Sequence, residues 1–329
     1  MIKRTLLLLL LCLCSAGADY ITLGSIHPDG SGITWQLRDG RYEVSFSPPV
    51  PWTYTVDING DVTITGYIGT GGIVTMPDTI EGHPVTAVAD WSLANNLNIL
   101  SLTLPNGLKS LGEGVFADAL LSAVTLPAGL THMGDYCFDR CTNLLSISWP
   151  AALTAVPYDA FSGCSSLIAV TLPTGLLEIG TGAFGDTKLT HISIPTTVTT
   201  IGTGAFSSSG LTNIVIPDSV TSLGGAFTWC MDLRAVTLST NLTALADYLF
   251  GSCTALQTIV IPENVTAVGN RTFCRCTGLL GVYFRGNAPT VHELAFEATG
   301  GTVYRTSGAT GWPTVPDPWG GRPTDIWTP

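Results

Sequence analysis

The stretch LIAVTLPTGLLEIGTGAF, residues 167–184, contains one complete copy of the pattern that decides the fold. Its apolar residues stand at set distances from Pro173, and they are Leu167, Val170, Leu172, Leu176, Ile179, Ala183 and Phe184. The alternation in V-x-L predicts a short strand with one face turned inward. Pro173 then ends the strand, because proline has no backbone N–H to donate to a ladder.

This pattern recurs along most of the chain. Aligned on the last residue of G-x-x-A-F, the copies are centred on Leu93, Phe116, Phe138, Phe161, Phe184, Phe206, Phe227, Phe250, Phe273 and Phe296. Every interval between these centres is 21, 22 or 23 residues. A fixed period of this length is typical of a solenoid, in which each unit is too small to bury its own core and stacks on its neighbours.

A second recurring position lies three residues after the aromatic. It holds Asn96, Ala119, Cys141, Cys164, Thr187, Ser209, Cys230, Cys253, Cys276 and Thr299. Alternation of Asn and Cys in one slot predicts a stacked column that bonds to the backbone in a tight bend. Neighbouring coils lie about 4.8 Å apart on the strand side, within the range that a disulfide spans. Disulfides between coils therefore stay open, although buried reduced thiols that act as small apolar side chains are favoured.

Cys274 occupies a different column, one residue after the aromatic. The other members of this column are mostly small or polar, which predicts that Cys274 faces solvent. Arg271 and Arg275 are close in sequence, and two neighbouring cations should lower the pKa of the thiol. Cys274 is therefore a candidate reactive thiol.

The full pattern L-x-x-V-x-L-P-x-x-L-x-x-I-G-x-x-A-F-x-x-C resembles the BspA-like leucine-rich repeat proteins of bacterial surfaces. Residues 53–84 look like the segment that precedes the repeats in that family. Residues 282–327, with VYFRGNAP, TVYRTSGATGW and GGRPTDIW, look like a segment that often follows them. The resemblance covers roughly residues 52–327. It implies extracellular recognition or adhesion, indicates no particular ligand, and carries no catalytic residues.

The pattern and the resemblance together predict a β-rich leucine-rich repeat solenoid. We expect a right-handed coil of about ten repeats of 21–23 residues, with a parallel sheet on its concave face. The predicted divisions are a signal peptide at 1–18, an N-terminal leader with a hairpin at 19–51, the solenoid with its N-terminal cap at 52–285, and the last coil with a C-terminal cap at 286–329.

The two ends carry signals of their own. Lys3 and Arg4 precede an apolar run and the small residues 16–18, which is typical of a secretory signal peptide cleaved after Ala18. Asp39-Gly40 and Asn59-Gly60 sit between strand-like runs and predict two hairpins. Because the end coils of a solenoid have no neighbour, we expect the second hairpin to cover the first coil. The tryptophans expected to form a lid on the last coil are Trp312, Trp319 and Trp327.

Composition excludes several classes of function. Only 11% of the residues are charged, and without Lys3 and Arg4 the formal net charge is −13. Such a chain disfavours nucleic acid and anionic membranes, whose binding needs clustered Lys and Arg. No stretch after the leader is long and apolar enough to span a membrane.

No catalytic or metal-binding pattern stands out. The five histidines fall in different coils and columns, so they do not suggest a metal site. Residues 57–61, DINGD, faintly resemble a calcium loop, but they lack the downstream glutamate and suit a hairpin turn better. We therefore expect no enzymatic activity, no metal and no cofactor.

Two functions fit this organisation. The leading hypothesis is extracellular or cell-surface recognition or adhesion, with a protein or glycan bound on the concave face. The alternative is a structural scaffold or surface-layer component that self-associates.

Outward residues of the strands are small in the first coils and become larger from residue 191 onward. Binding energy concentrates on aromatic residues, arginine and groups that make directed hydrogen bonds. The candidate binding residues are His191, Asn213, Arg234, Gln257 and Tyr283. That they are ordinary solvated residues in a drifting repeat stays an open alternative.

Overall fold

The computed structural model describes residues 20–22, 33–38, 41–46, 50–315 and 317–328. All regular elements in these ranges are strands. The chain divides into two compact units, Met1–Thr53 and Tyr54–Pro329, which are described separately. The predicted signal peptide lies outside the described residues.

The first unit contains a three-stranded antiparallel sheet. It is made of β1 (Tyr20–Thr22), β2 (Ile33–Arg38) and β3 (Arg41–Phe46) in the order β1-β2-β3. Strands β2 and β3 pair from Ile33↔Phe46 to Arg38↔Arg41, which confirms the first predicted hairpin. The two residues that join these strands lie outside the described part of the chain.

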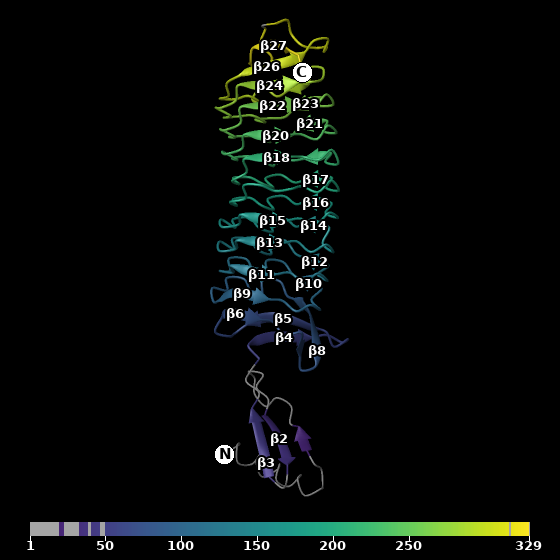
Figure 1. Ribbon diagram of the computed structural model, residues 1–329, viewed down its shortest axis with the longest axis vertical. Helices are drawn as coiled ribbons and strands as arrows, with labels where there is room; N and C mark the ends of the chain where they lie inside the picture. The colour runs from purple at the N-terminus through teal and green to yellow at the C-terminus, as the bar shows by residue number, and fades with distance from the viewer. Residues whose placement is uncertain (1–19, 23–32, 39–40, 47–49, 316, 329) are drawn as a thin grey trace. The chain divides into compact units, whose positions relative to one another are not determined.

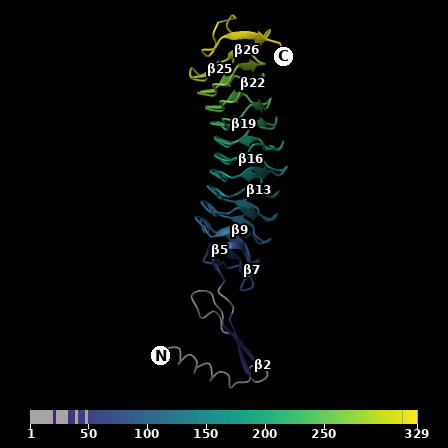
Figure 2. The same cartoon turned by 60° about the vertical axis from the view of Figure 1, so that its left-hand side comes forward.

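The second unit is a stack of coils (Figures 1 and 2), as the leucine-rich repeat pattern predicted. Each regular coil contributes one strand to each of two ladders. The stack has about twelve turns, compared with about ten counted from the aromatic, because strands β26 and β27 both follow Phe296 and continue the ladder without an aromatic of their own.

The first ladder, called here the long-strand ladder, is formed mainly by the L-x-x-V-x-L-P segments. Its strands are β6 (Gly72–Thr75), β9 (Ile99–Thr103), β11 (Ala123–Thr125), β13 (Ser146–Ser148), β15 (Ala169–Thr171), β18 (Asn213–Val215), β20 (Ala235–Thr237), β22 (Thr258–Ile261), β24 (Gly281–Phe284), β26 (Thr302–Thr306) and β27 (Thr324–Trp327). Pairing is parallel and repeats by one coil, as in Ile214↔Val236 and Val260↔Tyr283. Residues 190–194 occupy the same place in their coil without forming a strand.

The second ladder, the short-strand ladder, is built from the L-x-x-I-G segments. Its regular members are β10 (Ser110–Leu111), β12 (His132–Met133), β14 (Ala155–Val156), β16 (Glu178–Ile179), β17 (Thr200–Ile201), β19 (Ser222–Leu223), β21 (Ala244–Leu245), β23 (Ala267–Val268) and β25 (Thr290–Val291). In most of these two-residue strands the second side chain is buried and the first is not. The turn that follows, with the G-x-x-A-F motif, leads back to the long-strand ladder and is called the return turn.

A column of stacked phenylalanines forms the centre of the core. Neighbouring rings from Phe116 to Phe296 lie 5.0–5.8 Å apart, centroid to centroid, and all eight pairs are stacked. Each ring is almost fully buried. The regular spacing of the aromatic in the sequence thus becomes a continuous apolar column along the unit.

The slot after the aromatic bonds to the backbone, as predicted. Each of its five cysteines donates its thiol to the carbonyl oxygen of the aromatic in the preceding coil, for example Cys164 to Phe138 at 3.1 Å and Cys276 to Phe250 at 2.9 Å. Asn96 instead accepts from the backbone N–H groups of Asn98 and Ile99. All seven described cysteines are buried and unbridged, and for the five slot cysteines this agrees with the interpretation as small apolar side chains.

The short-strand ladder continues toward the N-terminus beyond β10. Strand β4 (Trp52–Val56) neighbours β5 (Val62–Tyr67), followed in the same sheet by β8 (His83–Val88), which also pairs with β7 (Thr79–Ile80). The Asp57 carboxylate accepts the backbone N–H groups of Asn59 and Asp61, and Gly60 has a φ of 87°. These contacts describe a hairpin turn, as predicted for this segment.

The far end is closed by two of the three predicted tryptophans. Trp312 and Trp319 both pack on Phe284, and Trp319 also meets Phe296, the last ring of the phenylalanine column. Trp327 does not belong to this lid, because its ring packs against Tyr283 on the long-strand ladder. The expectation of three tryptophans in one lid was therefore wrong for Trp327.

Candidate binding sites

The predicted binding residues lie along the later coils of the long-strand ladder. Asn213 begins β18 and Tyr283 lies in β24, whereas Arg234 and Gln257 immediately precede β20 and β22. His191 lies in the segment that forms no strand, beside the Thr190 hydroxyl. All are exposed except Tyr283, which is half-buried. The structure places them in three neighbouring columns, so they share a face but do not form one compact cluster.

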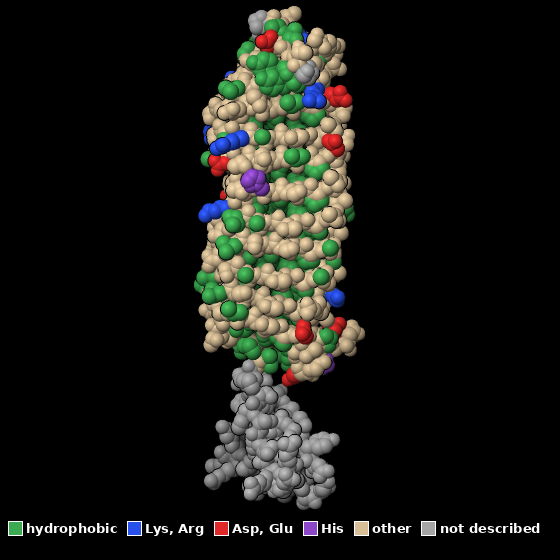
Figure 3. Space-filling model, in the orientation of Figure 1, with side chains coloured by type: hydrophobic (Ala, Val, Ile, Leu, Met, Phe, Trp, Pro, Cys, Tyr) green, Lys and Arg blue, Asp and Glu red, His purple; other side chains and the backbone are tan. Residues whose placement is uncertain are grey.

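Tyr283 is part of an aromatic group that the sequence analysis did not identify. Its ring stacks on that of Tyr304 at 4.5 Å and 6°, and Trp327 meets it edge-on at 5.2 Å. This group appears as the hydrophobic area over β24, β26 and β27 (Figure 3). Tyr304 follows Tyr283 by 21 residues, one repeat period, so its position in the same column was readable from the spacing.

The early coils of this ladder carry more apolar surface than the sequence suggested. The outward residues flanking the buried Leu, Val or Ile are small, as expected. One position before them, however, Leu100, Leu145 and Ile168 are 47%, 53% and 56% exposed. The sequence analysis compared only the two columns that flank the inward residue, so it made no prediction for this apolar column.

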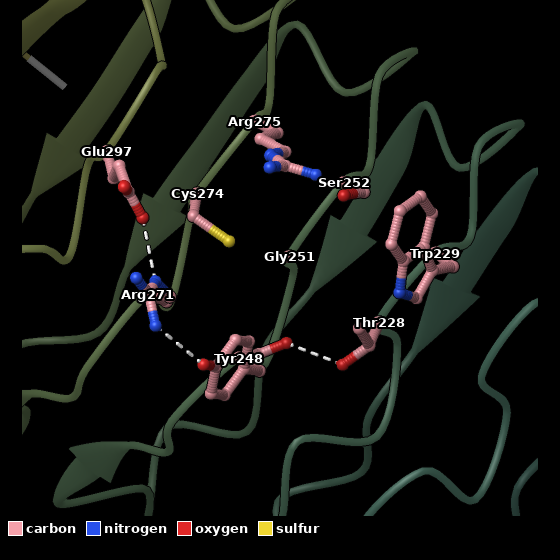
Figure 4. Close-up of a pocket in the computed structure, with 9 residues that line it drawn as sticks. All are labelled: Thr228, Trp229, Tyr248, Gly251, Ser252, Arg271, Cys274, Arg275 and Glu297. Atoms are coloured by element: carbon pink, nitrogen blue, oxygen red, sulfur yellow. Dashed lines mark hydrogen bonds and ion pairs between the residues drawn. The ribbon is translucent and has the colours of Figure 1, made fainter.

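A separate pocket lies on the return turns of four consecutive coils (Figure 4). Its volume is about 240 Å³, and its lining residues are Thr228, Trp229, Tyr248, Gly251, Ser252, Arg271, Cys274, Arg275 and Glu297. None of them belongs to the long-strand ladder. We call this site the return-turn pocket.

Three columns of the repeat form the return-turn pocket. Gly251 and Cys274, one residue after the aromatic, are its floor. Trp229, Ser252 and Arg275, two residues after the aromatic, make one wall, and Tyr248 and Arg271, two residues before it, make the other. The hollow exists because Gly251 has no side chain between those of Thr228 and Cys274.

The walls are set by an unusual backbone conformation. All five wall residues have a positive φ, between 54° and 64°. Glycine adopts this conformation at no steric cost and fills the same position in other coils, as at Gly114, Gly182 and Gly204. In the pocket, four large side chains, those of Trp229, Tyr248, Arg271 and Arg275, occupy positions where the backbone favours glycine, and they form most of the walls.

The two arginines of the pocket differ in their contacts. Arg271 donates to the Glu297 carboxylate at 2.7 Å and to the Tyr248 hydroxyl at 3.0 Å, and its charge lies over the Tyr248 ring. Its hydrogen bond holds the pKa of Glu297 below the ordinary value. Arg275 has no side-chain hydrogen bond or ion pair with a described residue, and it extends toward Ser252 (Figure 4).

Cys274 differs from the prediction in two respects. It is only 7% exposed, because it lies on the pocket floor between walls that carry arginine side chains. Burial raises the pKa of its thiol, and Glu297 raises it further, while Arg271 and Arg275 offset only part of the shift. The expectation of a solvent-facing thiol with a lowered pKa was therefore wrong.

The pKa values of the slot cysteines are raised as well. Burial raises the pKa of Cys141 and Cys276 to about 12 and that of Cys230 to about 11. Among the described residues, no group of three or more His, Cys, Asp or Glu side chains is placed to hold a metal ion. That part of the chain also contains no helix of the length and apolarity that a membrane span requires.

Comparison with known proteins identifies the repeat. A family model described as "BspA type Leucine rich repeat region (6 copies)" matches residues 86–212 and 201–304, together more than half of the chain. The comparison with curated proteins found no match to this chain.

Several solved structures are similar. A leucine-rich repeat protein of T. pallidum is 25% identical over 71% of this chain and 90% of its own, with a TM-score of 0.47. A leucine-rich cell surface protein of Faecalibacterium prausnitzii A2-165 is 24% identical over 79% and 94%, with a TM-score of 0.41. The pneumococcal vaccine antigen PcpA is 16% identical over 87% and 88%, with a TM-score of 0.45.

Proposed function

Because the chain belongs to the BspA-type leucine-rich repeat family, we propose that it is a non-catalytic recognition or adhesion protein, exported and acting outside the cell or at its surface. The secretory pattern of residues 1–18 supports export. The partner is a protein or glycan, bound on the later coils of the long-strand ladder.

The observation that carries this proposal is the change of outward side chains along the ladder. Small residues dominate the two inner columns of the early coils, whereas the later coils present an exposed arginine, amides and the stacked pair Tyr283 and Tyr304. Arg234 has no ion-pair partner among the described residues. Aromatic residues and arginine are the side chains on which binding energy concentrates.

The stacked coils provide a rigid support for such a surface. Parallel pairing joins β22, β24, β26 and β27 into one sheet, so the aromatic group rests on a hydrogen-bonded platform. Solenoids use extended faces of this kind to bind partners. A preorganised surface loses little conformational freedom on binding, which favours affinity.

A binding screen tests this function. Residues 19–329 would be applied to immobilised matrix proteins, host cells and glycans, alongside Arg234→Ala, Tyr283→Ala and the early-coil control Thr125→Ala. For any partner found, we expect each late-coil substitution to weaken binding by about 1 kcal/mol or more and the control to have no effect. Loss of binding in Thr125→Ala alone would place the site elsewhere. Self-association without any bound partner would favour the scaffold alternative.

A further inference from the structure

We propose that the return-turn pocket binds a single acidic sugar residue, one whose ring carries a carboxylate. The pocket is separate from the face assigned above, because its lining comes from the return turns alone. The two proposals can therefore fail independently.

The charge of the pocket favours a singly charged anion. Arg271 and Arg275 face one carboxylate, that of Glu297, which Arg271 already binds at 2.7 Å. Arg275 thus offers an unpaired guanidinium at the rim, and guanidinium binds carboxylates through two parallel hydrogen bonds. One excess positive charge matches a carboxylate better than a doubly charged phosphate.

The position of this charge within the chain is also informative. From Tyr54 onward the chain has nine basic residues, and six of them, all arginine, follow residue 230. The whole chain has a formal net charge of −11. Residues 231–329 also hold seven acidic residues, so this end is close to neutral while the rest of the chain is strongly acidic. Such a protein repels extended polyanions, and a local excess of arginine therefore suits a small anionic group better than a nucleic acid or a sulfated polymer.

The remaining lining suits a polyhydroxylated ring. Trp229, 45% exposed, offers an aromatic surface on which the apolar C–H face of a pyranose packs. Ser252 Oγ has no hydrogen-bond partner among the described residues. Thr228 Oγ1 donates to the Tyr248 carbonyl at 2.8 Å and keeps its lone pairs for a ligand hydroxyl. An aromatic surface beside a few placed polar and charged groups is typical of sites that orient a small molecule.

The size of the pocket sets the size of the ligand. Its volume of about 240 Å³ is below the roughly 300–1,000 Å³ of sites that hold drug-sized molecules. One sugar ring fits better than an oligosaccharide. The floor allows close approach, since a Cβ added to Gly251 would point between Cys274 Sγ at 3.4 Å and Thr228 Cγ2 at 3.6 Å.

The test uses isothermal titration calorimetry on residues 19–329. The probes are the methyl glycosides of N-acetylneuraminic acid and of glucuronic acid, which separate the two common sources of a sugar carboxylate. The glucuronic acid methyl ester and methyl glucoside are the neutral controls. We expect at least one acidic probe to bind with a Kd on the order of 1 mM, the neutral probes at least tenfold more weakly, and binding to weaken as salt is raised.

Substitutions locate the site. Arg275→Ala should raise the Kd at least tenfold, and its turn should tolerate the change because Ala298 holds the same position with a φ of 54°. The matched control is Arg140→Ala, in the same column but already paired with Asp118 at 2.6 Å, which should leave binding unchanged. Gly251→Leu should fill the pocket and abolish binding, whereas Gly185→Leu, at the equivalent position of an earlier coil, should not.

Several outcomes would overturn the assignment. They are no binding of either acidic probe at about 20 mM, equal binding of the methyl ester, or an unchanged Kd in Arg275→Ala. Binding of a short peptide through its free terminal carboxylate, with no binding of the sugars, would assign the pocket to protein chain ends instead. Arg234→Ala should leave the Kd of the acidic sugars unchanged. If this variant no longer bound them, the sugar site would belong to the long-strand ladder and not to the return-turn pocket.

Discussion

Removing one ring from the phenylalanine column should show how strongly neighbouring coils are coupled. Phe206 is fully buried and stacks on Phe184 at 5.7 Å and on Phe227 at 5.6 Å. Replacing a core phenylalanine by alanine costs about 3–5 kcal/mol, which includes the cavity left behind. Because both stacking contacts disappear, we expect Phe206→Ala to lie at the upper end of this range, near 5 kcal/mol.

Two comparison variants calibrate that magnitude. Phe116→Ala removes the same group from the same slot, but Phe116 stacks only on Phe138 in the column and has Leu93 on its other side. It should cost about 1 kcal/mol less, the worth of one aromatic pair. Phe206→Leu keeps most of the apolar volume, and Leu93 shows that leucine suits the slot, so about 1.5 kcal/mol is expected.

The assay is guanidinium unfolding followed by far-ultraviolet circular dichroism. In a repeat array, stability is close to a sum of coil and interface contributions. A cavity in the middle should therefore separate the two halves and split the transition, whereas Phe116→Ala should only shift the midpoint. A single sharp transition in Phe206→Ala, with a loss no greater than in Phe206→Leu, would refute the idea that the column couples the coils.

Three further outcomes are expected. With residues 1–18 removed, a thiol reagent should find seven thiols after denaturation, and seven minus an even number would reveal disulfides. In the native protein labelling should be slow, with Cys274 the fastest, and its rate should rise with pH because the pKa of this thiol is raised. Deletion of residues 286–329 removes Trp312, Trp319 and the strands that cover β24, so the fragment should oligomerise, and a monodisperse 19–285 chain would contradict a lid role. Folding lowers the pKa of Glu297, so its pairing with Arg271 stabilises the fold at a pH above the pKa of the unfolded chain. This stabilisation is lost as the pH falls through the pKa of the folded state. In Glu297→Gln, the free energy of unfolding should therefore depend less on pH below about pH 4.5.

The inward positions of the repeat made the fold predictable. Each inward side chain contacts the equivalent side chain of the next coil, so the sequence period alone is enough to place it. This holds for the phenylalanines, for the strand residues before proline and for the cysteine slot. Strands β26 and β27 follow Phe296 and have no aromatic of their own, so counting aromatics gave about ten coils where the stack has about twelve turns. Trp327 was placed in the lid for a similar reason, because its pairing with Tyr283 depends on a turn outside the repeat.

The outward positions require a two-dimensional comparison, and this is why the return-turn pocket was missed. Gly251 reads as one glycine among many in the sequence, and only its neighbours at about one period, Thr228 and Cys274, show that it opens a hollow. The same comparison explains Cys274, whose own column predicted exposure while the arginines of the two flanking columns bury it. The surroundings of a side chain on a solenoid surface are thus set by its own column, the two flanking columns and the adjacent coils. A comparison in both directions predicts that Tyr304 lies beside Tyr283. It also shows that Arg275 has no carboxylate in the preceding coil, whereas Arg140 pairs there with Asp118.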